Sequence, residues 1–307
     1  MAKLYTPAMA KIEAKKAKEL ARNHGKQKKS SPAKEAWKRL IRNKLAVVGM
    51  VIIILLLLLA VFAPYVIPHG YDVQDYDHLL QKPCAEFPFG TDNFGRDIFS
   101  RVLYGTRISI PIGFLCVIVA FAIGGTLGAI AAYCGGKVDN IIMRIMDIFQ
   151  SIPSMLLAIA VSATLGGGIR NLVIAIAVST MPARARVVRA SILTVKRNDY
   201  IESAKAMGAS SRRQLLKYML PNAIGPILTA VTFSVATAIL TVSSLSYIGL
   251  GIPEPLPEWG AMLAGGKAYL SSAPYILIFP GVAVMITVLA LNMFGDGLRD
   301  ALDPRLK

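Results

Sequence analysis

Long apolar runs alternate with short polar connections over most of the chain. A run of about 20 apolar residues is long enough to cross the hydrocarbon core of a bilayer as a helix. The six runs that approach this length are Leu45–Ile67, Ile108–Cys134, Ile141–Leu165, Leu172–Val188, Ile224–Ile248 and Tyr275–Phe294. The pattern therefore predicts an all-α polytopic membrane protein with six transmembrane helices.

Two of these runs need a closer reading. The fourth is the least regular, because Pro182, Arg184 and Arg186 interrupt its end. The first follows a polar tail, residues 1–44, and its apolar core exceeds the roughly 7–15 residues of a signal peptide. We therefore expect the first run to be a retained membrane anchor.

Lysine and arginine are divided unequally between the two sides of the predicted spans. One side holds 28 of the 34 basic residues, in the tail 1–44, the connections 135–147 and 183–221, and the terminus 295–307. The opposite side holds only 6. Basic residues close to spans mark the cytoplasmic side of a membrane protein. Both termini and the 183–221 connection are therefore predicted to be cytoplasmic.

Composition agrees with a membrane protein. Hydrophobic residues make up 54% of the chain, the mean hydropathy is +0.54, and the 17% of charged residues are clustered between the runs. A net charge of +16 can indicate a nucleic-acid partner. Here the basic residues flank apolar spans and no basic domain studded with aromatic residues is present, so no nucleic acid is expected.

Candidate chemistry is sparse. The three cysteines and three histidines are scattered without the spacing of metal ligands, so neither a metal nor another cofactor is predicted. The second, fifth and sixth spans have no ionisable residue in their central turns. Ion-coupled carriers usually need such residues to bind and release ions. If the protein is a transporter, its energy is expected to come from elsewhere.

The connection NDYIESAKAMGASSRRQLLKYMLPN is a long, cationic polar stretch between two apolar runs. Asp199 and Glu202 have the spacing of a capping box, which predicts the start of a short helix. Gly208 can supply the left-handed stop. A second helix is expected from about Ser210, and Pro221 is expected to close it and to begin the next span. Two short helices joined at a glycine would form a compact, rigid projection.

These residues resemble the EAA signature of binding-protein-dependent ABC importer permeases. The matching positions are Glu202, Ser203, Ala204, Gly208, Leu220 and Pro221, with mild departures at Ser203 and Tyr218. The resemblance implies that the loop forms coupling helices, whose residues at those positions contact a groove of an ATP-binding subunit. The chain has no G-x-x-x-x-G-K-[ST] motif of its own. It is therefore expected to be a transport subunit and not an enzyme.

Three further stretches narrow the resemblance. FGTDNFGRDIFSR, LSYIGLGIPEPLPEWGAML and NMFGDGLRDALDPRL are similar to segments of the C-type permease subunit of dipeptide, oligopeptide and nickel importers. The resemblance covers about residues 35–307 and implies the type I ABC importer permease fold. It also implies four kinds of partner: a second homologous permease in a heterodimer, one or two ATP-binding subunits, an extracytoplasmic binding protein and membrane lipid.

The expected function follows from this resemblance. The protein would form half of a translocation pathway for short peptides in a bacterial or archaeal plasma membrane. Nickel or a metal chelate is the alternative cargo. Two other classes of function are less well supported. The uncharged span centres argue against an ion-coupled secondary carrier. The two short helices expected in the 198–222 connection argue against a membrane scaffold without transport activity.

The predicted organisation has four parts. Residues 1–44 form a basic cytoplasmic tail that ends in an interfacial elbow helix at 31–44. Residues 45–67 form the first span and 68–106 an extracytoplasmic loop. Residues 107–307 form the permease core, with the coupling loop at 196–221.

Two more groups of residues are candidates for function. Ser243, Ser244, Ser246 and Tyr247 form a polar cluster near the outer end of the fifth span, which would line the pathway or serve helix packing. Gly124 and Gly128 have the GxxxG spacing that permits close helix approach. In the outer loop, Asp75, Asp77 and Asp92 are candidates for docking the binding protein. Alternatively, Asp92 and Arg96 stabilise a structural turn.

Overall fold

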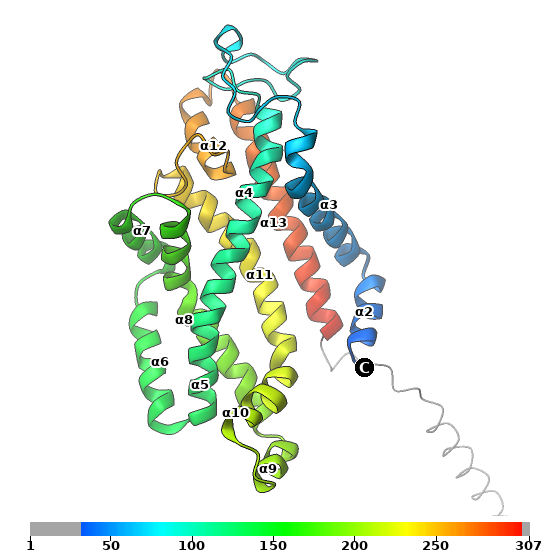
Figure 1. Cartoon of the computed structure of the whole chain (residues 1–307), viewed down its shortest axis with the longest axis vertical. Helices are drawn as coiled ribbons and strands as arrows, with labels where there is room; N and C mark the ends of the chain where they lie inside the picture. Colours follow the sequence, from blue (N-terminus) through cyan, green and yellow to red (C-terminus); the bar gives the residue numbers. More distant parts are fainter. Residues whose placement is uncertain (1–31, 303–307) are drawn as a thin grey trace, which may run out of the picture.

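A computed structural model describes residues 32–302, and the tail 1–31 and residues 303–307 lie outside the described range. Within that range the regular structure is helical, apart from one isolated bridge between Thr91 and Asp97 (Figure 1). The predicted all-α class is confirmed. The prediction of a basic cytoplasmic tail falls mostly outside the described residues.

Five helical segments of the described range are long and apolar enough to cross a membrane. They are α3 (Lys44–Val66), α4 (Ile98–Ala120) with α5 (Thr126–Cys134), α8 (Ile169–Lys196), α10 (Ser211–Arg213) with α11 (Leu220–Tyr247), and α13 (Tyr275–Leu302). A π-helical turn joins the two helices in each of the paired segments, at Phe121–Gly125 and at Gln214–Met219. Five of the six predicted spans are therefore present as continuous helices.

The third predicted span is not straight. Residues 141–165 belong to two helices, α6 (Gly136–Gln150) and α7 (Ser154–Leu165), whose axes differ by 80°. Pro153 explains the break, because it has no backbone N–H and disfavours a helical conformation at the residue before it. The total reaches six spans only if this bent pair counts as one.

The second and fourth spans are longer than predicted. Helix α4 begins at Ile98, so residues 98–106, which the sequence assigned to the outer loop, are helical. Asp97 caps this helix by accepting hydrogen bonds from the backbone N–H groups of Phe99 and Ser100 at 3.1 and 3.2 Å. Helix α8 continues through Pro182 to Lys196 instead of ending near Val188.

Glycines allow the helices at the centre to approach closely. A Cβ atom on Gly128 would lie 2.1 Å from the backbone oxygen of Ala185, and one on Gly124 would lie 2.4 Å from that of Met181. Both contacts join the α4–α5 segment to α8. The close helix approach predicted from the GxxxG spacing is confirmed.

The first helices pack on the last one. Helix α2 (Pro32–Arg42) buries Leu40 against Ala46 of α3 and Ala301 of α13. Its Trp37 is 53% exposed. The predicted elbow helix is therefore present, and its place at the membrane surface stays a prediction. Many apolar side chains of α3 are exposed, as expected for a helix in contact with lipid.

Polar structure gathers at the two ends of the helix bundle. At one end lie the connection after α3 and the short helix α12 (Trp259–Gly266), and at the other lies α9 (Asp199–Ala206) with α10 (Figure 1). We call residues 198–219 the inner projection. We call residues 68–97, together with the segment around Glu254, the outer cap.

Candidate functional site

The inner projection begins differently from the prediction. Helix α9 starts with Asn198 at the N-cap position, and that side chain makes no capping hydrogen bond. Asp199 is already in the first turn, so the predicted capping box with Glu202 is wrong. The two carboxylates still stand near the positive end of the helix dipole, where negative charge is favourable. Glu202 itself is exposed.

The glycine stop is confirmed. Gly208 has φ +78° and directly follows the last residues of α9. The backbone N–H of Ala209 donates to the carbonyl of Ala204, and that of Gly208 donates to Lys205, both at 3.0 Å. These two bonds define a Schellman motif. A Cβ atom on Gly208 would meet nothing within 4 Å, so the residue is required for its backbone conformation and not for space.

The second part of the projection is continuous with the next span. Ser210 caps α10 by accepting a hydrogen bond from the N–H of Arg213 at 3.4 Å. The π-helical turn Gln214–Met219 then leads directly into α11. Pro221 lies in the first turn of α11, so the prediction that it begins the next span is confirmed, and the prediction that it closes a separate helix is wrong. The wider π turn accommodates it, because the backbone there need not form the usual i to i−4 bond.

Buried contacts hold the projection against the spans. Ile201 and Ala204 are each 4% exposed, so Ala204 faces inward and cannot present its side chain to a partner. The amide of Gln214 donates to the backbone oxygen of Ala209 at 2.6 Å. Tyr133 of α5 donates to the same Gln214 side chain at 3.4 Å. Of the predicted coupling residues, Glu202, Ser203, Gly208 and Pro221 are exposed and Leu220 is half-buried.

A cavity of about 390 Å³ lies among α4, the break between α6 and α7, α8 and α11. Side-chain hydroxyl groups line much of it: Ser154, Ser179, Thr180, Ser234, Thr237 and Thr241. The residues from α11 follow a spacing of three and four, which places them on one face of that helix. This spacing was the available sequence signal for the cavity, and the sequence analysis missed it.

Five of these six hydroxyl groups already use their hydrogens in bonds to the backbone. Thr180 donates to the carbonyl of Ile176 at 2.8 Å, and Thr241 donates to that of Thr237 at 2.8 Å. Ser179, Ser234 and Thr237 also donate to carbonyls of their own helices. A hydroxyl that donates in this way still has free lone pairs. These groups therefore offer hydrogen-bond acceptors to anything in the cavity.

Arg184 is the only charged residue among those that line the cavity. Its guanidinium carbon lies 5.6 Å from the centre of the Phe121 ring. Its Nε atom is buried and has no hydrogen-bond partner among the described residues. In the sequence this arginine appeared only to interrupt the fourth span.

The serines predicted to line the pathway do not line this cavity. Ser243 is buried with its hydroxyl 3.5 Å from a carboxylate oxygen of Glu258, and Ser246 accepts a hydrogen bond from the N–H of Ile252 at 3.4 Å. Ser244 donates to the carbonyl of Leu240. Tyr247 is 42% exposed at the end of α11. A pathway role for these residues stays a prediction.

Glu258 is a buried acid that the sequence analysis missed. It is fully buried and caps α12 by accepting from the N–H of Ala261 at 2.9 Å. The hydroxyl of Ser109 donates to its other oxygen at 3.3 Å. The indole of Trp259 next to it donates to the carbonyl of Val102 at 3.0 Å. These bonds fix α12 to α4.

The outer cap is organised around a buried carboxylate. Asp92 accepts hydrogen bonds from the backbone N–H groups of Phe94 and Arg96 at 2.9 and 3.0 Å, and from the Arg96 guanidinium at 2.6 Å. Gly95 has φ +71°, and a Cβ atom there would lie 1.7 Å from the backbone oxygen of Asp75. Only glycine fits that turn.

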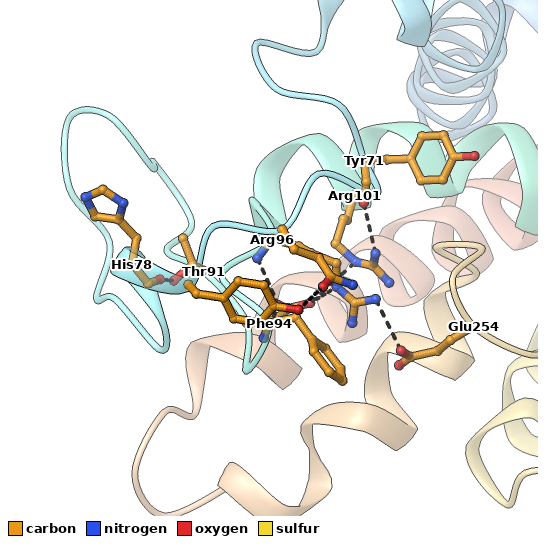
Figure 2. Close-up of polar contacts among 10 residues, drawn as sticks. Tyr71, His78, Thr91, Phe94, Arg96, Arg101 and Glu254 are labelled. Carbon is orange, nitrogen blue, oxygen red and sulfur yellow. Dashed lines mark hydrogen bonds and ion pairs between the residues drawn. The ribbon is translucent and has the colours of Figure 1, made fainter.

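Two arginines extend this cluster to other segments (Figure 2). Arg96 also reaches Glu254, with 3.2 Å between its nitrogen and the carboxylate oxygen. Arg101 of α4 lies 3.7 Å from Asp92 and donates to the backbone oxygen of Tyr71 at 2.9 Å. Asp92 is only 5% exposed, and this burial argues against its predicted contact with a binding protein. The alternative of a turn stabilised by Asp92 and Arg96 is confirmed.

Asp75 and Asp77 remain on the surface of the outer cap. Asp75 accepts from the N–H of Asp77 at 3.1 Å and lies 2.7 Å from the His78 ring nitrogen. The hydrogen bond with His78 holds the pKa of Asp75 below its usual value. The same bond raises the pKa of His78. Both aspartates are accessible to a partner.

Two family models match the chain. Residues 124–307 match the binding-protein-dependent transport system inner membrane component. Residues 31–83 match the N-terminal TM domain of oligopeptide transport permease C. The first match includes the inner projection, and the second includes helix α3.

Whole-length relatives are also found. The dipeptide transport system permease protein of Alkalihalophilus pseudofirmus is 46% identical, over 90% of this chain and 91% of that protein. The glutathione transport system permease protein of Pectobacterium atrosepticum is 45% identical, over 90% of this chain and 92% of that protein. An inward-facing structure of the MetNI methionine ABC transporter has the same fold, with a TM-score of 0.54, 21% identity, and coverage of 67% of this chain and 96% of that chain.

Proposed function

Because the chain belongs to the binding-protein-dependent transport system inner membrane components, we propose that it forms half of a translocation pathway for short peptides. It is a C-type permease subunit of an ABC importer. Its two relatives carry a dipeptide and glutathione in their names, and glutathione is itself a small peptide. The cavity beside α8 and α11 is the observation that best supports this cargo.

The lining of the cavity favours a peptide over a metal cation. It offers hydroxyl acceptors and one guanidinium, and no Asp or Glu is among the lining residues. A bare nickel ion would be repelled by Arg184 and would find no carboxylate or histidine ligand there. A peptide can use the acceptors through its N–H groups. An anionic metal chelate is the alternative cargo.

ATP hydrolysis belongs, in this proposal, to one or two partner subunits that dock on the inner projection. The projection is held to α5 and α8 by buried contacts and presents Glu202, Ser203 and Gly208 at its surface. A second homologous permease completes the pathway as a heterodimer. The excess of basic residues on the same side supports cytoplasmic termini in a bacterial or archaeal plasma membrane.

An extracytoplasmic binding protein would dock on the outer cap. Asp75 and Asp77 are accessible acids of the cap, whereas Asp92 is buried inside it. Reversing both surface charges should lower ATP hydrolysis stimulated by the binding protein and leave assembly intact. Unchanged stimulation would remove these two residues from the docking surface.

Uptake in a deletion strain tests the cargo. Cells lacking this gene should lose accumulation of labelled dipeptides and tripeptides, and the reintroduced chain should restore it. Nickel accumulation, measured in the same cells, should not change. Normal peptide uptake with lost nickel uptake would assign the chain to metal transport instead.

A further inference from the structure

Three arginines of α8 lie close together and have different surroundings. Arg186 pairs with Asp147, and Arg189 pairs with Asp139, so both join α8 to α6. Arg184 lines the cavity and pairs with no carboxylate of the described residues. A cation inside a membrane protein is costly and usually has a partner. The guanidinium of Arg184 is therefore available to an anion that enters the cavity.

We propose that Arg184 binds the terminal carboxylate of the peptide cargo as it passes through the cavity. The inference rests on the proposed function and adds a recognition element to it. A planar guanidinium can form two parallel hydrogen bonds to a carboxylate. The Phe121 ring, 5.6 Å from the guanidinium carbon, limits how far this side chain can turn.

The rest of the lining suits the other end of a peptide. Thr237 and Thr241 of α11 present oxygen acceptors, because their hydrogens are bonded to the helix. Such acceptors can take the N–H donors of a peptide backbone and of its ammonium group. The cavity volume of about 390 Å³ is within the usual range of small-ligand sites. Donors for the carboxylate and acceptors for the amines thus line one space.

The cavity can be probed without the binding protein, whose own preference would otherwise hide that of the permease. The assembled complex is purified with Cys84, Cys116 and Cys134 replaced by alanine and with Ser154→Cys as the single thiol of this chain. Ser154 lines the cavity, is exposed, and makes none of the contacts proposed for the peptide. Labelling by a maleimide is then followed with increasing alanyl-alanine or its C-terminal amide.

We expect alanyl-alanine to slow labelling at a concentration about tenfold or more below that of the amide, as charge-assisted hydrogen bonds imply. Arg184→Gln should remove this difference. Arg184→Lys keeps the charge without the planar fork and should retain part of it. Arg186→Gln changes a neighbouring arginine that is already paired, so it should keep the full difference.

Each contrary result has a distinct meaning. Equal protection by the acid and the amide, or a difference that survives Arg184→Gln, overturns the carboxylate site and leaves peptide transport standing. Loss of the partner permease from the purified Arg184→Gln complex assigns the carboxylate to that partner and also overturns the inference. If neither peptide slows labelling while the maleimide reacts, the peptide cavity of the proposed function fails as well.

Discussion

The outer cap and the inner projection are both polar segments between spans, and they use their charges in opposite ways. At the outer cap, Asp92 and Arg96 of the cap and Arg101 of α4 are at most 5% exposed, and both arginines pair with Asp92. In the inner projection, Ile201 and Ala204 are buried, while Glu202 stays exposed. Charges turned inward hold a fold together, and charges turned outward are available to a partner.

This difference separates stability from coupling. A change inside the outer cap should lower the stability of the whole chain, because the cap joins α4 to the segments around Tyr71 and Glu254. A change on the surface of the inner projection should affect the binding of partner subunits and transport, and leave the stability of the chain nearly unchanged. Variants of the two regions can therefore test the contrast directly.

The largest effect is expected from Asp92→Ala. The substitution leaves Arg96 and Arg101 without their shared carboxylate, and breaking one side of a buried ion pair costs about 3–5 kcal/mol. We expect low expression and a lowered thermal midpoint of the detergent-extracted complex. Asp77→Ala, at an exposed acid of the same cap, is the matched control and should leave both unchanged. Equal midpoints for the two variants would contradict the structural role of Asp92.

A smaller and more local effect is expected from Gly208→Val. Because φ is +78° at this position, a branched residue would be strained by about 1–2 kcal/mol. The spans should still insert, while ATP-dependent uptake and co-purification of the ATP-binding subunit should be lost. Asparagine tolerates the left-handed conformation, so Gly208→Asn should keep most of the uptake. If valine were tolerated as well as asparagine, the Schellman turn would not matter for coupling.

Only a small loss of stability is expected from Glu202→Lys, because the structure contains no capping box and the exposed carboxylate contributes only through the helix dipole. Uptake and co-purification of the ATP-binding subunit should nevertheless fall, through loss of a contact with that subunit. Glu86→Lys is the same charge reversal at an exposed residue of the outer cap and should leave co-purification intact. A thermal midpoint lowered in Glu202→Lys as far as in Asp92→Ala would show that this residue has a structural role after all.

The smallest change concerns pH at the surface of the outer cap. The pKa of Asp75 is lowered from 3.8 by its contact with His78. The stability that Asp75 gives to the outer cap is therefore present above pH 3.8 and is lost as pH falls through the lowered pKa. The pKa of His78 is raised from 6.5 by the same contact. The stability that His78 gives to the outer cap is therefore present below pH 6.5 and is lost as pH rises through the raised pKa. Their contact is therefore strongest between pH 3.8 and 6.5.

Hydrogen exchange at the Asp77 amide can follow this contact, because that N–H donates to Asp75. After correction for the intrinsic exchange rate, protection should be highest inside the window and fall on both sides. His78→Gln should abolish the fall at the alkaline side only. A profile without a maximum would contradict the pairing.

Hydropathy predicted where the spans lie, because the apolar content of a segment of about 20 residues decides whether it can lie in lipid. It missed the helical start of α4, since the charged Arg101 is buried there through contacts with Asp92 and Tyr71, which come from another segment. It also missed the bend after Gln150, because an averaged apolar run carries no record of the backbone conformation that Pro153 imposes.

The site was predicted unevenly for a similar reason. The glycine turn at Gly208 depends on neighbouring residues, and local sequence was sufficient to find it. The cavity depends on which faces of α8 and α11 are opposed, and that information is not contained in either helix. The sequence therefore did not by itself show that Thr237 and Thr241 line a cavity. It marked Arg184 only as a residue that interrupts the end of the fourth span.

The unbroken helix from Ser211 to Tyr247 has a mechanical consequence. At about 1.5 Å per residue, its 37 residues form a rod roughly 55 Å long. If such a rod pivots near its middle, a tilt of about 10° moves each end by about 5 Å, in opposite directions, for that length. It is a lever that converts a displacement at one membrane face into the opposite displacement at the other, with no change in any backbone dihedral angle along its length.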